Sequence, residues 1–471
     1  MEECNKQFCK SYMLLDYDKI GLVDLISLLI SPNIGKRKFV DCKQTSEPSF
    51  RRRWLIFLSI VVHKLLQLIA KPLSFVGTCV ELWFSLLSRN GGFPGLLFNT
   101  LTWQVVAPDK SSSTYVSFVG NFDHRTELDG NIKRGDPRYN PALAIMAAKL
   151  SYESGSYIET VVNQHWQMEF LGFFDFHNAY QNKASTQAFL MRDKAADGSE
   201  TVAVVFRGTE PFDADSWCSD VDISWYELRG VGRIHGGFMK ALGLQKCLGW
   251  PKTLQQAGPE HEDRPLFAYY KIREMLTEIM SQNEKAKFFV AGHSLGGALA
   301  TVFPAVLMLH DEDMLLKRLE GVYTFGQPRV GDEKFGKYMK RKLDEYGIGY
   351  YRFVYGFDIV PRLPYDDANL MFKHFGTCIF FNRNYQGQVV VEEPYKNYFS
   401  PGGTIGMIWN ALMELTRSFT IAIDYGEEYS EGWLLTGVRL VGLLIPGLPA
   451  HLPRDYVNCT RLGPPHLLHS S

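Results

Sequence analysis

Residues 288–303 read FFVAGHSLGGALATVF, and this stretch decides the fold. Its apolar start, residues 288–291, predicts a buried strand, and the small apolar residues at its end predict a helix. Between the two, Gly292 and Gly296 flank Ser294 and leave room for a sharp turn. The stretch therefore predicts that Ser294 is a nucleophile on a strained turn between a strand and a helix.

Helix-like and strand-like segments alternate along the chain on both sides of this turn. Proline at the start and apolar periodicity predict helices over 141–152 and 266–280. Short β-like runs predict strands over 186–191, 200–206, 321–325 and 350–355. Such alternation indicates an α/β fold with a mainly parallel central sheet that helices cover on both faces.

Composition limits the classes of protein to which the chain can belong. Its 471 residues, 46% hydrophobic and 21% charged, suffice for one large α/β domain with appendages. A net charge of −1 argues against a nucleic-acid partner. The 8 cysteines show no CxxC pair and no metal-ligand spacing, which favours a reducing compartment. Residues 1–10 lack an apolar run behind a basic start, so we expect no cleaved secretory signal and a cytosolic location.

Residues 51–105 form the most lipophilic part of the sequence. Lys64 and Lys71 interrupt the apolar run, and Pro72 separates its two halves. A spanning helix needs about 20 nearly uninterrupted apolar residues, and proline kinks or breaks a helix. We therefore favour a hydrophobic hairpin or a pair of interfacial helices that contact a lipid surface. The alternatives are a helical layer packed on the rest of the protein and a single spanning helix over 54–80.

A serine nucleophile needs a base within hydrogen-bond reach and an acid that orients the base. Asp358 follows the β-like run 350–355, at the edge where a parallel sheet presents functional groups. His451 lies in a loop with prolines on both sides, which makes it one candidate base. His374 borders a strand-like run and fits a structural role better. The remaining candidates, in a proline-rich tail, are His466 and His469.

The transition state of acyl transfer also needs two donors to the developing oxyanion. The backbone N–H of Leu295 directly follows the nucleophile and can supply one. Thr209 follows the predicted strand 200–206 and can offer both its N–H and its hydroxyl. Gly208 would let the backbone turn sharply there, although an Arg-Gly-Thr sequence is also found in ordinary turns at strand ends.

Six sequence blocks in a fixed order resemble the class 3 (fungal-type) lipase family. They extend over residues 141–460, which makes the resemblance specific. The blocks are FRGT at 206–209, IHGGF at 234–238, AGHSLGG at 291–297, TFGQPRVG at 324–331, DIVPRLP at 358–364 and PAHL at 449–452.

The resemblance implies the α/β-hydrolase fold and a set of roles for individual residues. Ser294, Asp358 and His451 would be the nucleophile, the orienting acid and the base. Thr209 and Leu295 would be the oxyanion donors, and no metal or organic cofactor would be needed. The family also implies a lid, here at about 210–228, whose aromatic residues would turn towards lipid. His235 and His293 would pack or form hydrogen bonds.

Two features depart from the small secreted members of the family. They are the lipophilic segment 51–105 and a long insertion between His374 and His451. Both resemble the plant oil-body lipases, a branch that is attached to lipid droplets. This resemblance implies stored triacylglycerol as the substrate and a place on the cytosolic face of the droplet, associated with its membrane. Formation of a homo-oligomer stays open.

Five segments and two alternative functions complete the expectations. The segments are an N-terminal extension (1–50), the lipid-associating segment (51–105), a connection (106–140), the lipase domain (141–460) and a tail (461–471). The first alternative is a phospholipase A1 or galactolipase that acts on membrane lipids. The second is a hydrolase-fold protein that binds lipids or partners without catalysis.

Overall fold

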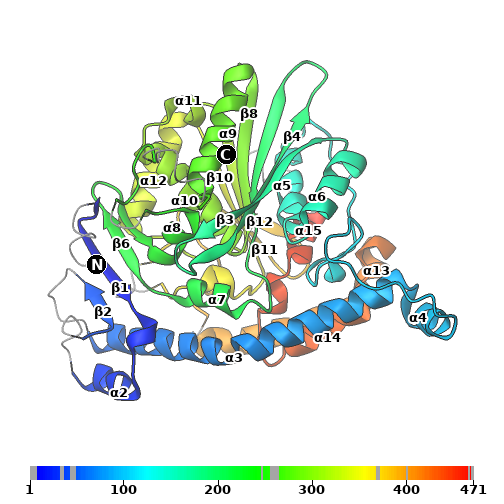
Figure 1. Cartoon of the computed structure of the whole chain (residues 1–471), viewed down its shortest axis with the longest axis horizontal. Coiled ribbons are helices and arrows are strands. Elements are labelled where there is room, and N and C mark those ends of the chain that lie inside the picture. The colour runs from blue at the N-terminus through cyan, green and yellow to red at the C-terminus, as the bar shows by residue number, and fades with distance from the viewer. Residues whose placement is uncertain are drawn as a thin grey trace.

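An eight-stranded sheet forms the centre of the molecule (Figure 1), with the strand order β12-β11-β10-β9-β8-β5-β4-β3. This computed structural model describes residues 8–31, 37–42, 49–245, 248–254, 265–366, 372–398, 401–464 and 467. The five neighbouring strands from β11 to β5 are parallel, and the outer strands are antiparallel. The strands are β3 (Glu169–Asn178), β4 (Lys183–Lys194), β5 (Glu200–Phe206), β8 (Ala286–His293), β9 (Leu319–Phe325), β10 (Gly349–Tyr355), β11 (Thr377–Phe381) and β12 (Gly387–Val390).

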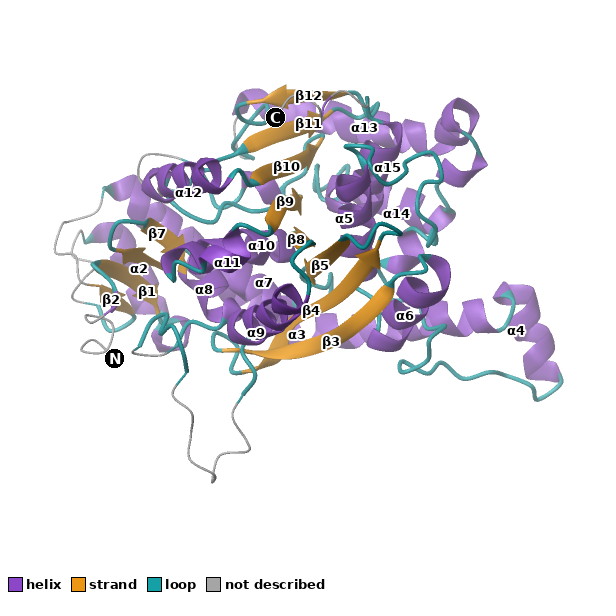
Figure 2. Cartoon of the chain, turned by 90° about the horizontal axis from the view of Figure 1, so that it is seen from above, coloured by secondary structure: helices purple, strands orange, loops and turns teal. Residues whose placement is uncertain are grey.

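Helices cover both faces of this sheet, as Figure 2 shows from above. One face carries α8 (Gly236–Leu242), α9 (Ala268–Gln282), α10 (Leu295–Leu309), α11 (Asp313–Leu316) and α12 (Glu333–Tyr346). The other carries α5 (Tyr139–Leu150), α6 (Gly155–Thr160), α13 (Pro401–Tyr425), α14 (Trp433–Val441) and α15 (Pro453–Leu462). The predicted α/β-hydrolase architecture is confirmed, and each helix and strand predicted from the sequence is present.

Strand β8 shows why two separate cores form. Successive side chains of a strand point to opposite faces of the sheet. Phe288 and Val290 accordingly pack into the core beneath α10, and Phe289 and Ala291 pack into the core beneath α5. Because all four side chains are buried, the strand reads as a continuous apolar run, as expected for a central parallel strand.

A second sheet joins the N-terminal residues to the catalytic part of the chain. Its order is β2-β1-β6-β7, with β1 (Ser11–Leu15), β2 (Val40–Cys42), β6 (Trp225–Leu228) and β7 (Gly232–His235). Trp225 and Tyr226 are buried in this sheet, so the expectation that the lid extends to residue 228 is wrong. The division of the chain into five segments stays a prediction.

The lipophilic segment forms one long helix, α3 (Phe50–Arg89), followed by the short helix α4 (Gly92–Leu101). Pro72 lies inside α3, so the expected break at this residue is wrong. Because proline has no N–H, the carbonyl of Leu68 lacks its hydrogen-bond donor within the helix. Pro72 and Leu68 both lie on the exposed side of α3, where water can donate to this carbonyl instead. Among the described residues, α3 alone has the length and hydropathy of a membrane-crossing helix, but it lies flat along one side of the molecule (Figure 1).

The short helix α7 (Ala214–Val221) lies between α3 and the body of the protein, and α2 (Leu22–Ile30) packs near the start of α3. Several polar contacts join α3 to this region. Ser59 Oγ donates a hydrogen bond to the carbonyl of Val221 at 2.8 Å, and the ring of His63 stacks on that of Tyr17 at 3.7 Å. Helix α3 therefore covers the segment that the sequence predicts to be the lid.

Candidate active site

Ser294 occupies the turn between β8 and α10, with φ 59° and ψ −129°. An added Cβ at Gly292 would clash with the backbone of Gly296, and one at Gly296 would clash with the carbonyl of Phe206. Both positions therefore require glycine. The positive φ is strained for a non-glycine residue, and the hydrogen bond from the Ser294 N–H to the carbonyl of Phe325, at 2.9 Å, helps to hold it.

The structure brings Ser294, His451 and Asp358 into one chain of hydrogen bonds. Ser294 Oγ lies 2.8 Å from Nε2 of His451, and Nδ1 of His451 lies 2.8 Å from Oδ2 of Asp358. All three side chains are buried, and the serine is only 3% exposed. Residues that are far apart in the sequence thus meet at the carboxyl ends of β8 and β10, as the chain order predicts.

Two donors hold the carboxylate of Asp358 in place. The N–H of Val360 donates to Oδ1 at 2.9 Å, and the hydroxyl of Tyr456, on α15, donates to Oδ2. Burial and the neighbouring Asp358 both raise the pKa of Tyr456 well above its usual value, so its hydroxyl keeps the proton that it donates. Oδ2 therefore accepts from Tyr456 and from His451 together.

His293 braces the loop that carries His451. Its Nε2 lies 2.8 Å from the backbone carbonyl of His451, and its Nδ1 lies 2.8 Å from the hydroxyl of Tyr152. A carbonyl can only accept, so Nε2 carries the hydrogen and Nδ1 accepts from Tyr152. Burial, followed by the proximity of His451, holds the pKa of His293 well below its usual value. A neutral imidazole in a structural role fits these contacts.

The two predicted oxyanion donors lie at the ends of neighbouring strands. Leu295 is the first residue of α10, where helical N–H groups lack partners within the helix. Thr209 follows β5, and its hydroxyl donates to Oδ2 of Asp220, on α7, at 2.9 Å. An added Cβ at Gly208 would clash with the Tyr152 hydroxyl and come within 2.6 Å of the His293 carbonyl. Glycine therefore lets the Thr209 loop approach the serine turn closely.

Comparison with known proteins identifies the family. The family described as Lipase (class 3) matches residues 203–368. The protein named Triacylglycerol lipase OBL1 from Arabidopsis thaliana is 38% identical over 500 residues, which cover 98% of this chain and 96% of that protein. The chain belongs to the class 3 lipase family. A relative of the same name from Nicotiana tabacum is 39% identical over 478 residues, which cover 87% of this chain and 83% of that protein.

Among solved structures, lipase II from Rhizopus niveus is similar to this lipase. The two chains are 22% identical, and the match covers 53% of this chain and 82% of the fungal one, with a TM-score of 0.37. The family membership rests on the sequence relatives. As a member of this family, the chain is a serine ester hydrolase.

The other histidines considered as bases lie elsewhere in the lipase. Nε2 of His374 is 2.7 Å from the carbonyl of Pro361, and this buried ring also lies 3.7 Å from Glu393. His374 is therefore structural, as expected. His466 and His469 lie outside the described residues. Within the described ranges, no group of three or more His, Cys, Asp or Glu side chains could hold a metal ion.

Sequence reasoning missed three residues that support the site of this lipase. Tyr456 holds Asp358, Tyr152 holds His293, and Asp220 holds Thr209. Burial raises the pKa of Asp220 to about 7. None of the three belongs to a sequence block with a known chemical role, and only the fold brings each next to its partner.

Proposed function

We propose that this lipase hydrolyses triacylglycerol to diacylglycerol and free fatty acid through an acyl-enzyme on Ser294. The observation that carries the proposal is the continuous chain of hydrogen bonds from Asp358 through His451 to Ser294. The nature of the substrate is supported by relatives that match nearly the whole chain and bear the name triacylglycerol lipase.

In this proposal each residue has a role in one or both of two half-reactions. Ser294 Oγ attacks the ester carbonyl while Nε2 of His451 takes its proton, and Asp358 stabilises the resulting imidazolium. The N–H of Leu295 and the donors of Thr209 bind the oxyanion. His451 then protonates the departing diacylglycerol oxygen, which leaves the acyl group on Ser294. A water molecule, deprotonated by His451, hydrolyses this ester and releases the fatty acid.

In this proposal the segment over about 210–224 is the lid that covers the serine. Ser294 is buried, so an ester reaches it only after the covering segment moves. A cavity of about 850 Å³, lined by parts of α3, by Arg207 and by residues 210–214, gives this segment space to move. Asp220 ties the Thr209 hydroxyl to α7, so a lid movement also changes the setting of this oxyanion donor.

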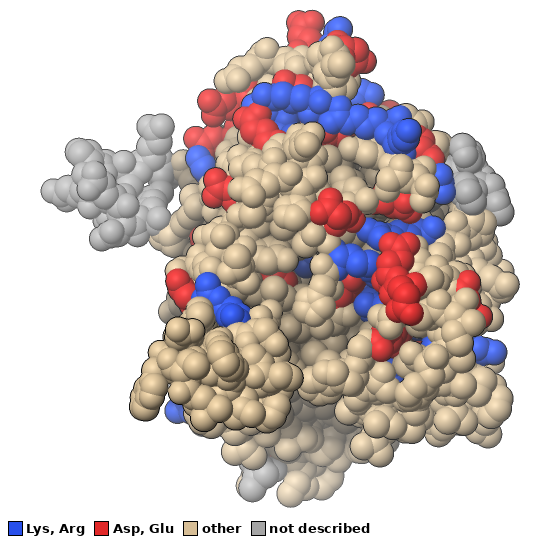
Figure 3. All heavy atoms as spheres, turned by 90° about the vertical axis from the view of Figure 1, so that its right-hand side faces the viewer, with Lys and Arg blue, Asp and Glu red and all other residues tan. Residues whose placement is uncertain are grey.

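The lipophilic segment attaches the enzyme to a lipid droplet, from the cytosolic side, in the same proposal. Helices α3 and α4 expose many large apolar side chains, among them Leu68, Phe75, Phe98 and Leu101. Apolar patches of this extent are typical of surfaces that contact lipid or protein. Figure 3 shows that the lowest part of the molecule, towards α3 and α4, is nearly free of charged residues.

A substrate comparison tests the proposed function. Purified full-length protein and Ser294→Ala are incubated with emulsified triolein, phosphatidylcholine vesicles and galactolipid vesicles, and released fatty acid is measured. We expect the wild type to release most fatty acid from triolein and the variant to release almost none, because removal of the nucleophile costs about 10⁶-fold in serine hydrolases. Preference for either vesicle would instead indicate a phospholipase or a galactolipase. Equal release by both proteins would refute the role of Ser294.

A further inference from the structure

The insertion between His374 and His451 forms a helical hairpin that exposes apolar side chains and buries charged ones, the opposite of most surface helices. On α13, on α14 and in the turn after α14, the exposed side chains are mainly apolar, among them Ile405, Trp409, Phe419, Ile423, Leu440 and Leu444. Residues 403–423 and 432–445 are all described, and none of their exposed side chains is charged. Helices on a water-exposed protein surface normally place charges outward and apolar residues inward. The outer side of this hairpin is therefore unsuited to water.

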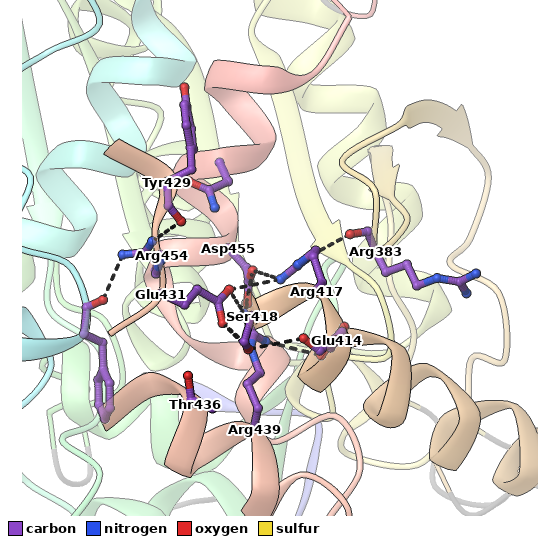
Figure 4. A network of polar contacts seen from close by, with 12 residues as sticks. Arg383, Glu414, Arg417, Ser418, Tyr429, Glu431, Thr436, Arg439, Arg454 and Asp455 are labelled. Carbon is purple, nitrogen blue, oxygen red and sulfur yellow. Dashed lines mark hydrogen bonds and ion pairs between the residues drawn. The ribbon is translucent and has the colours of Figure 1, made fainter. Parts of the chain in front are cut away.

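Apart from Asp424 in the last turn of α13, the charged residues of the two helices are buried and meet Glu431, which precedes α14, and a carboxylate from α15 in one cluster (Figure 4). We call it the α13–α14 charge cluster, and its members are Glu414, Arg417, Glu431, Arg439 and Asp455. Arg439 lies 2.9 Å from Glu431, 2.9 Å from Asp455 and 3.3 Å from Glu414. Arg417 lies 3.0 Å from Asp455 and 3.4 Å from Glu431.

Neutral donors also contribute hydrogen bonds to the cluster. Ser418 Oγ donates to Glu431 at 2.7 Å, and the hydroxyl of Tyr385 donates to Asp455 at 2.8 Å. Burial raises the pKa of Glu414, which favours its neutral form beside two guanidinium groups and two other carboxylates. Buried charges are costly unless they are paired. Here the pairing fixes which side of each helix faces the protein, and so it fixes the apolar side outward.

The exposed acidic residues of the hairpin, Asp424, Glu427 and Glu428, lie at the end of α13 and in the turn that follows it. Glu428 lies 3.6 Å from Arg461 of α15. Arg454 of the same helix donates at 2.7 Å to the carbonyls of Tyr429 and Ser430. The turn is thereby held away from the apolar outer side of α13 and α14.

The hairpin and the lipophilic segment form one continuous surface. The ring of Phe84, on α3, lies 5.9 Å from the ring of Trp433, at the start of α14. In Figure 1 both α3 and α14 lie at the lower side of the molecule, with α4 at the end of α3. The uncharged area seen in Figure 3 lies on this same side.

We propose that the outer side of the α13–α14 hairpin is a second lipid-contacting element, which enters the phospholipid-covered surface of neutral lipid together with α3 and α4. The choice of neutral lipid rests on the proposed function, because an enzyme that hydrolyses triacylglycerol has to contact that phase. An uncharged face matches acyl chains, which offer no partners for charges. Helices that lie flat with one side against the protein insert their other side to a depth of about 5–10 Å.

Charge substitutions on the outer side test this proposal in the full-length protein. Phe419 and Leu444 are 70% and 85% exposed, so Phe419→Glu/Leu444→Glu changes the surface without opening the core. The matched control is Leu248→Glu/Met314→Glu, which places two charges at exposed apolar positions in the loop after α8 and on α11, outside the hairpin, α3 and α4. Flotation with triolein droplets covered by phosphatidylcholine measures binding, and thermal unfolding verifies that both variants are folded.

We expect the droplet partition coefficient to fall at least about tenfold for Phe419→Glu/Leu444→Glu, because two large apolar side chains no longer leave water. The control should bind like the wild type, because its two new charges lie outside the proposed lipid-contacting surface. Equal binding by all three folded proteins would overturn the proposal.

Two further measurements distinguish other occupants of the surface. Light scattering without lipid measures whether the wild type is a dimer. If it is, and if Phe419→Glu/Leu444→Glu is a monomer that binds droplets as the wild type does, the surface would be assigned to a second copy of the chain. Equal wild-type partition into phosphatidylcholine vesicles and droplets would overturn the choice of neutral lipid. Release of fatty acid from the same droplets tests the proposed function separately, because a protein that binds droplets through this hairpin without hydrolysing triolein would refute only that function.

Discussion

At the residue scale, the contact between Tyr456 and Asp358 has a direct consequence for catalysis. Tyr456 donates to the same carboxylate oxygen that faces His451, so it positions the acid rather than touching the substrate. In Tyr456→Phe, we expect kcat on a soluble short-chain ester to fall about tenfold with little change in KM. The free energy of unfolding should fall by about 1.5–3 kcal/mol, the range for a hydrogen bond to a charged group.

A second buried tyrosine supplies the control for this prediction. Tyr385→Phe removes a hydroxyl that donates to Asp455, outside the catalytic residues. It should lower stability in urea titrations while leaving kcat close to that of the wild type. If both variants lose kcat equally, Tyr456 has only a structural role.

Asp220 gives the enzyme a pH-dependent stability. Burial raises the pKa of its carboxyl to about 7, whereas an unfolded aspartate titrates near about 3.9. The folded protein therefore binds the extra proton between these values, so the contribution of Asp220 to stability falls as pH rises through this window. Asp220→Asn removes this titration and keeps an acceptor for Thr209.

The variant should accordingly gain stability over the wild type as pH rises from about 4 to about 7, by a few kcal/mol in total. Urea unfolding midpoints of both proteins, measured at pH 5 and pH 8, test this difference in stability. An identical change of midpoint with pH in both proteins would show that Asp220 does not titrate as described.

The three residues of the proposed triad could be picked out from the sequence, but the residues that hold them could not. Ser294 stands in a glycine-bounded turn, and Asp358 and His451 follow it in the order that a parallel sheet requires. Tyr456 and Asp220 carry no comparable signal, because a tyrosine or an aspartate fits many buried and exposed settings. Only the packing of α15 and α7 against the sheet places their side chains beside the site.

At the scale of elements, the sequence misplaced the ends of two segments. Pro72 was expected to break α3, but the helix continues through it, with hydrogen bonds to the protein on both sides, from Ser59 before the proline and to Glu81 after it. Leu68, whose carbonyl loses its helical partner, is exposed. Trp225 and Tyr226 were expected in a mobile lid, but pairing of β6 with β1 and β7 buries them. In both cases tertiary contacts outweighed a local preference.

The contact between α3 and the lid predicts an effect of one glycine. An added Cβ at Gly77 would come within 2.5 Å of the side chain of Phe212, in the segment that leads to α7. In Gly77→Leu, we expect α3 and this segment to separate and the lid to open more often. Hydrolysis of a soluble short-chain ester without lipid should rise about fivefold for each 1 kcal/mol by which the closed state is weakened.

Gly437→Leu is the matched control, since an added Cβ there meets no atom within 4 Å. It should leave lipid-free activity unchanged. The lid assignment would be contradicted if Gly77→Leu remained folded, as judged by its thermal unfolding, and yet showed wild-type activity without lipid.

At the scale of the whole molecule, the apolar surfaces and the proposed lid lie on the same side. Helix α7 lies between the catalytic part and α3, and α4 and α14 extend the apolar surface beside it (Figure 1). The sequence predicted the fold and the lipophilic segment separately. Their relative placement could not be predicted, because it depends on contacts such as that of Ser59 with Val221, which no sequence pattern marks.

Covalent labelling tests most directly whether Ser294 is the nucleophile of a lipase that works at a lipid surface. The full-length protein is treated with an alkyl fluorophosphonate in a triolein emulsion, and its peptides are analysed by mass spectrometry. The serine oxygen bonds to phosphorus and fluoride leaves. We predict one adduct, on Ser294, that forms in parallel with the loss of fatty-acid release. An adduct on another serine that accompanies this loss, or full release after Ser294 is modified, would contradict the assignment.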